Sequence, residues 1–222
     1  AHALIDDLAE FGAPVLLFSG GEPLTRPDLL PLASYAAGKG LHTVLSSNGI
    51  LITREVAQDL KDAGISYAGI SIDGTEKVHD RFRGKKGAFQ ETLQGIRNLQ
   101  EAGVRTGLRC TITRFNLPDI NAIFDLVERE NIQRVCFYHL AYGGRGERIR
   151  QHDLSPQETR GAVDTIFQRT QELDGKGLST EVLTVDNHAD AILLYLKVKK
   201  EQPQRAEEVY KLLKRNGGNS SG

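Results

Sequence analysis

Short apolar segments alternate with longer amphipathic segments along the first 140 residues, and this alternation most strongly limits the folds open to the chain. The run Val15–Phe18 is wholly apolar, as expected for a strand buried on both faces. Later strands are predicted at 41–45, 65–72, 104–112 and 132–140, each shortly after a Gly or Asn that ends a helix. The segments between them have helical spacing, at 3–11, 27–39, 54–63, 88–102 and 116–130, whereas 76–87 is predicted as a charged loop. Such a repeat predicts an α/β fold with a parallel sheet and right-handed crossovers.

The pattern changes after Ala141. Residues 143–150 form a predicted basic loop, and Ser155-Pro156-Gln157-Glu158 has the features of a capping box that starts a helix to about Leu173. A strand at 178–185 and helices at 187–199 and 204–215 are predicted to follow. We therefore divide the chain into a core, residues 1–150, and an extension, residues 151–222.

Composition limits the partners. The net charge of −1 gives no reason to expect nucleic acid, and no run approaches the roughly 20 apolar residues that span a bilayer. The two cysteines, Cys110 and Cys136, make no disulfide framework, so we expect a reducing cytoplasm. The chain lacks methionine and starts inside an amphipathic pattern, so we expect an internal fragment of a longer protein.

Polar turns follow four of the predicted strands. They are Ser19–Glu22, Ser46–Gly49, Ser71–Gly74 and His139–Tyr142. Because the carboxyl ends of parallel strands gather at one edge, we expect these turns to bind a small polar ligand together.

Three of these turns resemble the radical S-adenosylmethionine (SAM) superfamily. Gly20-Gly21-Glu22-Pro23 resembles its GGEP motif, and Ser46-Ser47-Asn48-Gly49 its next strand end. Ser71-Ile72-Asp73-Gly74, followed by residues 79–84 (HDRFRG) and Phe89, is similar to its SxDG…HDxxRG…F stretch. One short motif is weak, but three in family order reduce the false-positive risk. The resemblance implies a partial (β/α)6 radical SAM barrel that lacks its first, cluster-bearing strand and has a helical C-terminal extension.

The resemblance also implies roles in SAM binding. Glu22 would accept hydrogen bonds from the SAM ammonium, Gly20 and Gly21 would allow close backbone approach, and Ser71 and Arg83 would hold its carboxylate. Asn48 and Asp73 are candidates for the ribose, and backbone groups at 137–140 for the adenine. The alternatives are a plain turn at Gly20–Pro23 and an ordinary surface arginine at Arg83, near Asp80.

The family's cluster motif, Cys-x3-Cys-x2-Cys, is absent from this chain. The resemblance implies a [4Fe–4S] cluster in the full-length protein and an electron donor such as flavodoxin or ferredoxin. No metal ligand is predicted within these residues, and Cys110 and Cys136 are interpreted as core thiols. The fragment alone is expected to be inactive.

A narrower resemblance points to radical SAM enzymes of heme d1 and siroheme-dependent heme biosynthesis. It rests on His139–Gly146, Thr184–Asp190 and Asn216–Gly222. It implies removal of propionate or acetate side chains from didecarboxysiroheme by way of a 5′-deoxyadenosyl radical, and a C-terminal cysteine-rich region beyond this chain.

Basic residues near the cavity mouth would suit a tetrapyrrole with several carboxylates. Our candidates are Arg145, Arg148 and Arg150, and the alternative is a solvated loop in which Glu147 is their partner. His139 and His188 are either structural or ligand-facing, and for His188 the structural role is preferred.

Three rival functions stay open at this point. They are a peptide-maturing radical SAM enzyme, a binding module that kept the fold without a cluster, and an aldolase-type barrel. The last ranks low, because no lysine occurs at the predicted strand ends.

Overall fold

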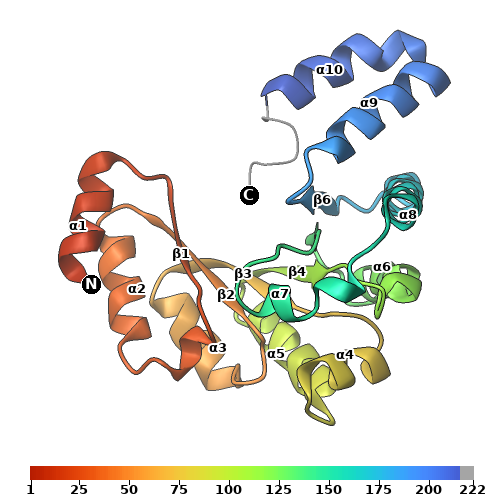
Figure 1. Cartoon of the computed structure of the whole chain (residues 1–222). Coiled ribbons are helices and arrows are strands. Elements are labelled where there is room, and N and C mark those ends of the chain that lie inside the picture. The colour runs from red at the N-terminus through yellow and green to blue at the C-terminus, as the bar shows by residue number, and fades with distance from the viewer. Residues whose placement is uncertain (216–222) are drawn as a thin grey trace.

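The computed structural model describes residues 1–215, apart from the side chain of Arg145. Six parallel strands form one sheet whose spatial order is the chain order, β1 to β6 (Figure 1). The strands are β1 (Val15–Phe18), β2 (His42–Ser47), β3 (Ile65–Ser71), β4 (Arg105–Thr111), β5 (Arg134–Tyr138) and β6 (Glu181–Val185). Within the described residues β1 and β6 lie at opposite edges and do not pair, so the sheet is an open, partial barrel. This confirms the predicted α/β fold class.

Helices connect or follow the strands, and one face of the sheet is covered by part of this set. They are α1 (His2–Phe11), α2 (Leu29–Gly38), α3 (Arg54–Asp62), α4 (Glu76–Arg83), α5 (Ala88–Glu101), α6 (Ile120–Arg129), α7 (Arg145–Arg148), α8 (Pro156–Gly175), α9 (Ala189–Glu201) and α10 (Ala206–Arg215). Short 3-10 turns occur at η1 (Pro23–Thr25), η2 (Leu117–Asp119), η3 (Arg150–His152) and η4 (Pro203–Arg205).

The two faces of the sheet have different environments because alternate side chains point to opposite sides. Leu45, Ile70, Leu108, Val135 and Phe137 are fully buried and pack in the main hydrophobic core together with α2, α3, α5, α6 and α8. The intervening residues, such as Tyr67, Ser71, Arg109 and Tyr138, are only half-buried. The second face is therefore open and available for polar groups.

Two sequence-based expectations are wrong. The first strand, Val15–Phe18, is not buried on both faces: Val15 is 51% and Leu17 42% exposed, because β1 lies at the sheet edge and these side chains are on the open face. The predicted loop at 76–87 contains α4, a helix with few apolar residues that ends at Gly84 in a left-handed conformation.

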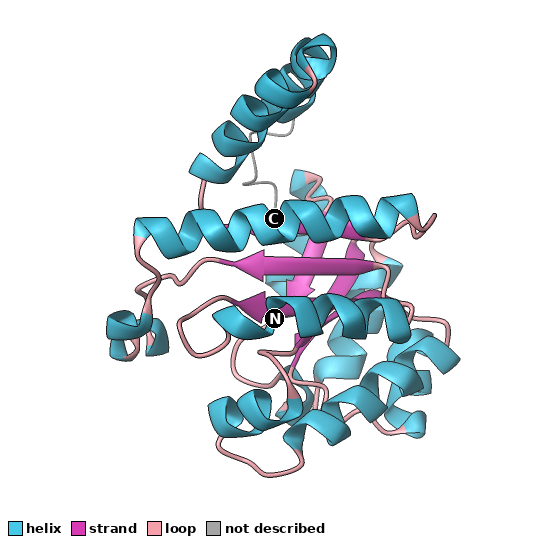
Figure 2. Cartoon of the chain, turned by 90° about the vertical axis from the view of Figure 1, so that its right-hand side faces the viewer, coloured by secondary structure: helices cyan, strands magenta, loops and turns pink. Residues whose placement is uncertain are grey.

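The C-terminal extension adds strand β6 to the sheet, and its last two helices then point away from the sheet. Ser155 and Glu158 form the predicted capping box of α8, and β6 then pairs with β5. The α9–α10 pair projects away from the sheet (Figures 1 and 2). The division at residue 150 stays a prediction, and the Asn216–Gly222 resemblance lies outside the described residues. Among residues 1–215 no helix has the length and apolar character needed to cross a membrane.

Candidate functional site

The first two polar turns are held together by Glu22, which follows β1. Its carboxylate accepts hydrogen bonds from the Ser47 hydroxyl at 2.8 Å, the Asn48 backbone N–H at 2.8 Å and the Leu24 backbone N–H at 3.2 Å. A carboxylate has about four acceptor positions, so Glu22 keeps capacity for a further donor.

The turn before Glu22 leaves space beside the backbone. Gly20 has a φ of +134°, which disfavours other residues, and an added Cβ at Gly20 or Gly21 would meet no atom within 4 Å. At the end of β2, Asn48 Oδ1 accepts from the Ile50 N–H at 2.9 Å. Both turns are therefore well ordered and open to a ligand.

Asp73 follows β3 and is 3% exposed. Its Oδ2 lies 2.6 Å from Nη2 of Arg83, which comes from α4. Burial raises the pKa of the Asp73 carboxyl, and the nearby Arg83 guanidinium opposes that shift. Arg83 Nε is also buried and has no hydrogen-bond partner among the described atoms. One polar position in this pair is thus available to a ligand.

His79 and Asp80 fix α4 against the turn. His79 Nδ1 accepts a hydrogen bond from the Asp73 backbone N–H at 3.1 Å, and its ring is in edge contact with Phe89. Burial lowers the pKa of His79 to about 4. Asp80 accepts from the backbone N–H groups of Gly87 and Phe89, at 2.6 and 2.9 Å, at the start of α5. Asp80 is thus occupied by backbone groups, and Arg83 is paired with Asp73 instead.

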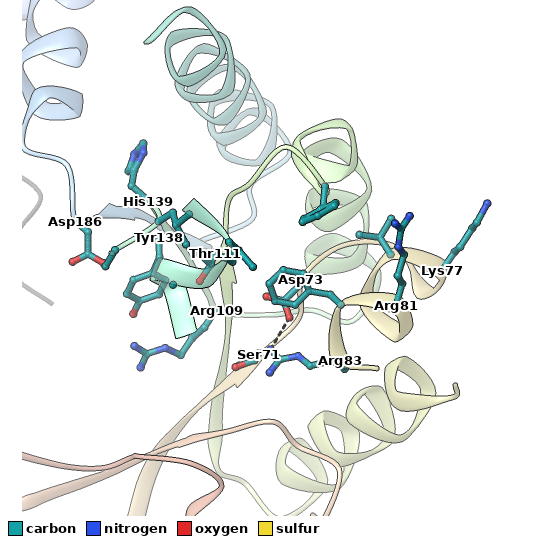
Figure 3. Close-up of a pocket in the computed structure, with 17 residues that line it drawn as sticks. Ser71, Asp73, Lys77, Arg81, Arg83, Arg109, Thr111, Tyr138, His139 and Asp186 are labelled. Carbon is teal, nitrogen blue, oxygen red and sulfur yellow. Dashed lines mark ion pairs between the residues drawn. The ribbon is translucent and has the colours of Figure 1, made fainter. Parts of the chain in front are cut away.

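A cavity of about 750 Å³ opens beside this turn (Figure 3). Its floor is formed by strand ends, and its walls by α4 and by the segment that follows β5. The polar lining residues are Ser71, Asp73, Lys77, Arg81, Arg83, Arg109, Thr111, Tyr138, His139 and Asp186. The apolar ones include Val78, Phe82, Phe115, Leu140, Ala141 and Ile149. The volume is in the range usual for small-molecule sites.

Arg109 is the principal site residue that the sequence analysis missed. It lies on the open face of β4, with its guanidinium 4.8 Å from the Tyr138 ring centroid. A Cβ at Gly69 would come within 2.7 Å of the Arg109 side chain, so the glycine on β3 makes room for it. A register pair of glycines, Gly69 and Gly107, inside two adjacent strands was the signal in the sequence.

His139 at the end of β5 is oriented by a buried carboxylate. Its Nε2 lies 2.7 Å from Oδ2 of Asp190, at the start of α9, and Asn187 donates to Oδ1 of the same carboxylate. Asp190 is 4% exposed. The pair joins the rim of the cavity to α9.

The structure brings only part of the predicted set into the cavity. Ser71, Asp73 and Arg83 line it, whereas Gly20, Gly21, Glu22 and Asn48 lie on the neighbouring turns and are not among its lining residues. Of the predicted substrate arginines, Arg148 and Arg150 are also outside the lining.

Those arginines belong to α7 and η3, where a loop had been predicted. Arg148 is exposed, and Arg150 stacks on the Tyr142 ring at 4.6 Å and lies 3.6 Å from Glu147. The side chain of Arg145 is outside the described part of the structure.

The cysteines do not form a metal site. Cys110 and Cys136 are both free and buried in β4 and β5, where burial raises their pKa values. Residues 1–215 contain no group of three or more His, Cys, Asp or Glu side chains suited to a metal ion.

Comparison with known proteins identifies the family. The sequence pattern of the radical SAM superfamily matches residues 2–127. The chain is 57% identical to Fe-coproporphyrin III synthase of Methanosarcina barkeri, over 99% of this chain and 55% of that protein. It is 36% identical to pre-heme d1 synthase of Dinoroseobacter shibae, over 100% of this chain and 55% of that protein. It thus spans about half the length of these curated relatives.

A solved structure agrees with the fold. Streptococcus suis SuiB bound to S-adenosylmethionine superposes with a TM-score of 0.70 at 14% identity, over 86% of this chain and 44% of that chain. Together with the match over residues 2–127, this shows that the chain belongs to the radical SAM superfamily.

Proposed function

We propose that this chain is the SAM-binding body of a radical enzyme that modifies a tetrapyrrole in an alternative route of heme biosynthesis. The observation that carries the proposal is the strand-end edge, where an ordered carboxylate at Glu22 follows β1 and a cavity lined by Arg83 and Arg109 opens beside the turn after β3. Such an edge offers an anion for an ammonium and cations for a carboxylate, as an amino-acid ligand requires.

The residues present fit SAM. Arg83 Nε is a buried donor without a partner, and the space beside Gly20 and Gly21 admits a close ligand. We assign Glu22 to the ammonium group of SAM and Ser71 and Arg83 to its carboxylate. Arg109 is added to the residues proposed to bind that carboxylate.

Ribose and adenine contacts complete this assignment. Asn48 and Asp73 are our candidates for the ribose hydroxyls, although Asp73 already contacts Arg83. Backbone groups at 137–140 remain our candidates for the adenine. Without a ligand, Asp73 pairs with Arg83 and holds its guanidinium in place. A bound ligand would contact the same guanidinium while that ion pair remains.

The described residues do not fit the iron–sulfur cluster. Three cysteine ligands are required in this family's motif, and the two cysteines here are buried on separate strands. We therefore propose that the cluster belongs to another part of the parent protein, as does the contact with flavodoxin or ferredoxin. Bound together, SAM and a reduced cluster supply radical chemistry, while this chain binds and orients SAM and shields it from water.

Acetate removal from didecarboxysiroheme is the reaction we favour. Identity is 57% to the Fe-coproporphyrin III synthase and 36% to the pre-heme d1 synthase. Propionate removal, as in the heme d1 branch, is the second candidate.

The test uses a polypeptide that contains this chain together with the cluster-binding segment. Under anaerobic conditions with reduced flavodoxin and didecarboxysiroheme, we expect 5′-deoxyadenosine and a tetrapyrrole product lighter by its acetate groups, measured by mass spectrometry. Glu22→Gln should weaken SAM binding about tenfold or more, because it removes a charge-assisted contact.

Other outcomes would assign other functions. Turnover of a peptide but not of the tetrapyrrole would support the peptide-maturation rival. SAM binding without cleavage, in a parent protein that holds no iron–sulfur cluster, would support the binding module.

A further inference from the structure

Three basic side chains that line the cavity are left without an acidic partner. Lys77, Arg81 and Arg109 make no ion pair within residues 1–215. Two other cations near the site do have acidic partners, since Arg83 pairs with Asp73 and Arg150 with Glu147. Unpaired cations in one cavity attract an anionic ligand, since the concave shape concentrates their field.

These cations lie at two levels. Arg109 lies at the floor, on β4, where SAM is proposed to bind. Figure 3 shows Lys77 and Arg81 on α4, on the other side of Asp73 from Arg109. They are four residues apart, so they lie on the same side of the helix. The mouth therefore has its own basic pair, separate from the floor.

Apolar side chains line the cavity between α4 and the segment after β5. Val78 comes from α4, Phe115 follows β4, and Leu140 and Ile149 follow β5. Phe115 is 37% exposed, although its ring contacts the tilted ring of His152 with centroids 4.1 Å apart. An exposed aromatic ring inside a cavity is suited to the face or edge of a planar apolar ligand.

Arg81 is already positioned by this wall. Its guanidinium lies 5.8 Å from the Phe115 ring centroid, and it makes no side-chain hydrogen bond in the described residues. Contact with the ring restricts the arginine while leaving its N–H groups available for a carboxylate. The geometry thus combines a ring contact with an anion contact at one place.

We propose that Lys77, Arg81 and Phe115 form a subsite, here called the α4 rim, that binds the peripheral carboxylates and ring edge of a tetrapyrrole. The inference rests on the proposed function and deepens it. It replaces Arg148 and Arg150 as substrate contacts, because these do not line the cavity and Arg150 is paired with Glu147.

The test compares two double variants of this chain. Lys77→Gln with Arg81→Gln removes the α4 rim charges. Lys86→Gln with Lys200→Gln is the matched control, since it removes two exposed positive charges that do not line the cavity. The probe is iron(III) coproporphyrin III, followed by its Soret absorbance, and its tetramethyl ester is the uncharged counterpart. Binding of labelled SAM is measured by equilibrium dialysis on the same samples.

We expect the α4 rim variant to bind iron coproporphyrin III about tenfold or more weakly, while the control variant stays within about twofold of the parent chain. The ester should bind all three proteins alike. Equal coproporphyrin affinity in both variants, or no binding to the parent chain, would overturn the α4 rim. If the parent chain does not bind SAM, but the α4 rim variant still binds coproporphyrin more weakly than the control variant does, the result would contradict the proposed SAM site and still support the α4 rim.

Discussion

Lowering the pH from 7 toward 4 is expected to weaken the fold through His79. The side chain is 1% exposed, and its Nδ1 accepts the Asp73 backbone N–H at 3.1 Å. An acceptor at Nδ1 requires the neutral ring with its proton on Nε2. Burial lowers the pKa of His79 to about 4, and the Arg83 guanidinium acts in the same direction. Protonation would therefore break a contact that shapes the turn after β3.

The size and sign follow from linkage. The usual value of 6.5 and the native value of about 4 differ by the equivalent of about 3 kcal/mol. Between these pH values the unfolded chain holds the proton and the native chain does not. The contribution of His79 to the free energy of unfolding is thus fully present above about pH 6.5, and it is lost as the pH falls toward 4.

The assay is urea denaturation followed by circular dichroism, between about pH 8 and pH 4.5, for the parent chain and for His79→Asn. The asparagine Oδ1 can replace Nδ1 as acceptor but does not titrate. At neutral pH the variant should be less stable than the parent chain, because replacing the imidazole ring with the smaller asparagine leaves a cavity beside Phe89. The gap between the two proteins should then narrow by about 2 kcal/mol or more toward pH 4.5. Curves that stay parallel over this range would refute the reasoning, since the carboxylates shared by both proteins cancel in the difference.

Other predictions concern stability elsewhere in the fold. A Cβ at Gly95 of α5 would lie 2.2 Å from the Gly49 carbonyl oxygen, so Gly95→Ala should lower the free energy of unfolding by about 1–3 kcal/mol in urea titrations. Gly161→Ala, in open space on α8, should instead raise it by about 0.5–1 kcal/mol, and a shared sign would contradict the steric argument. Ser155→Ala removes the hydroxyl that accepts from the Glu158 N–H and should lower the thermal midpoint through a loss of about 1 kcal/mol, whereas an unchanged midpoint would show that the cap is unimportant.

The strand–helix order was predictable because two local signals agreed. Apolar runs marked the strands, and glycines in the left-handed region, such as Gly64 and Gly103, ended the helices before β3 and β4. The capping box at Ser155 was visible for the same reason. These features depend on neighbours in the sequence, so the sequence alone reveals them.

What the sequence could not reveal depends on tertiary position. Val15–Phe18 has the same composition as a fully buried strand, and only the sheet order shows that one side of β1 is open. Arg109 is one of two arginines in the predicted strand 104–112, and nothing in the sequence distinguishes it from Arg105. Its importance emerges only when Gly69, on the neighbouring strand, is seen to make room for its side chain.

Helix α4 shows why hydrophobic periodicity fails at a functional element. His79 and Arg83, four residues apart, face Asp73 and anchor the turn after β3. Lys77 and Arg81 have the same spacing on a different side of the helix and line the cavity without acidic partners in the described structure. Both sides of the helix are thus polar, one because it holds a buried carboxylate and the other because it is proposed to meet an anionic substrate. The only apolar residues of this helix, Val78 and Phe82, are too few to mark it as an amphipathic helix in the sequence. The sequence of residues 79–84 was therefore recognisable as a family motif, although its helical structure was not. Helix α4 contacts the proposed SAM-binding turn through His79 and Arg83, and it carries Lys77 and Arg81 of the proposed α4 rim.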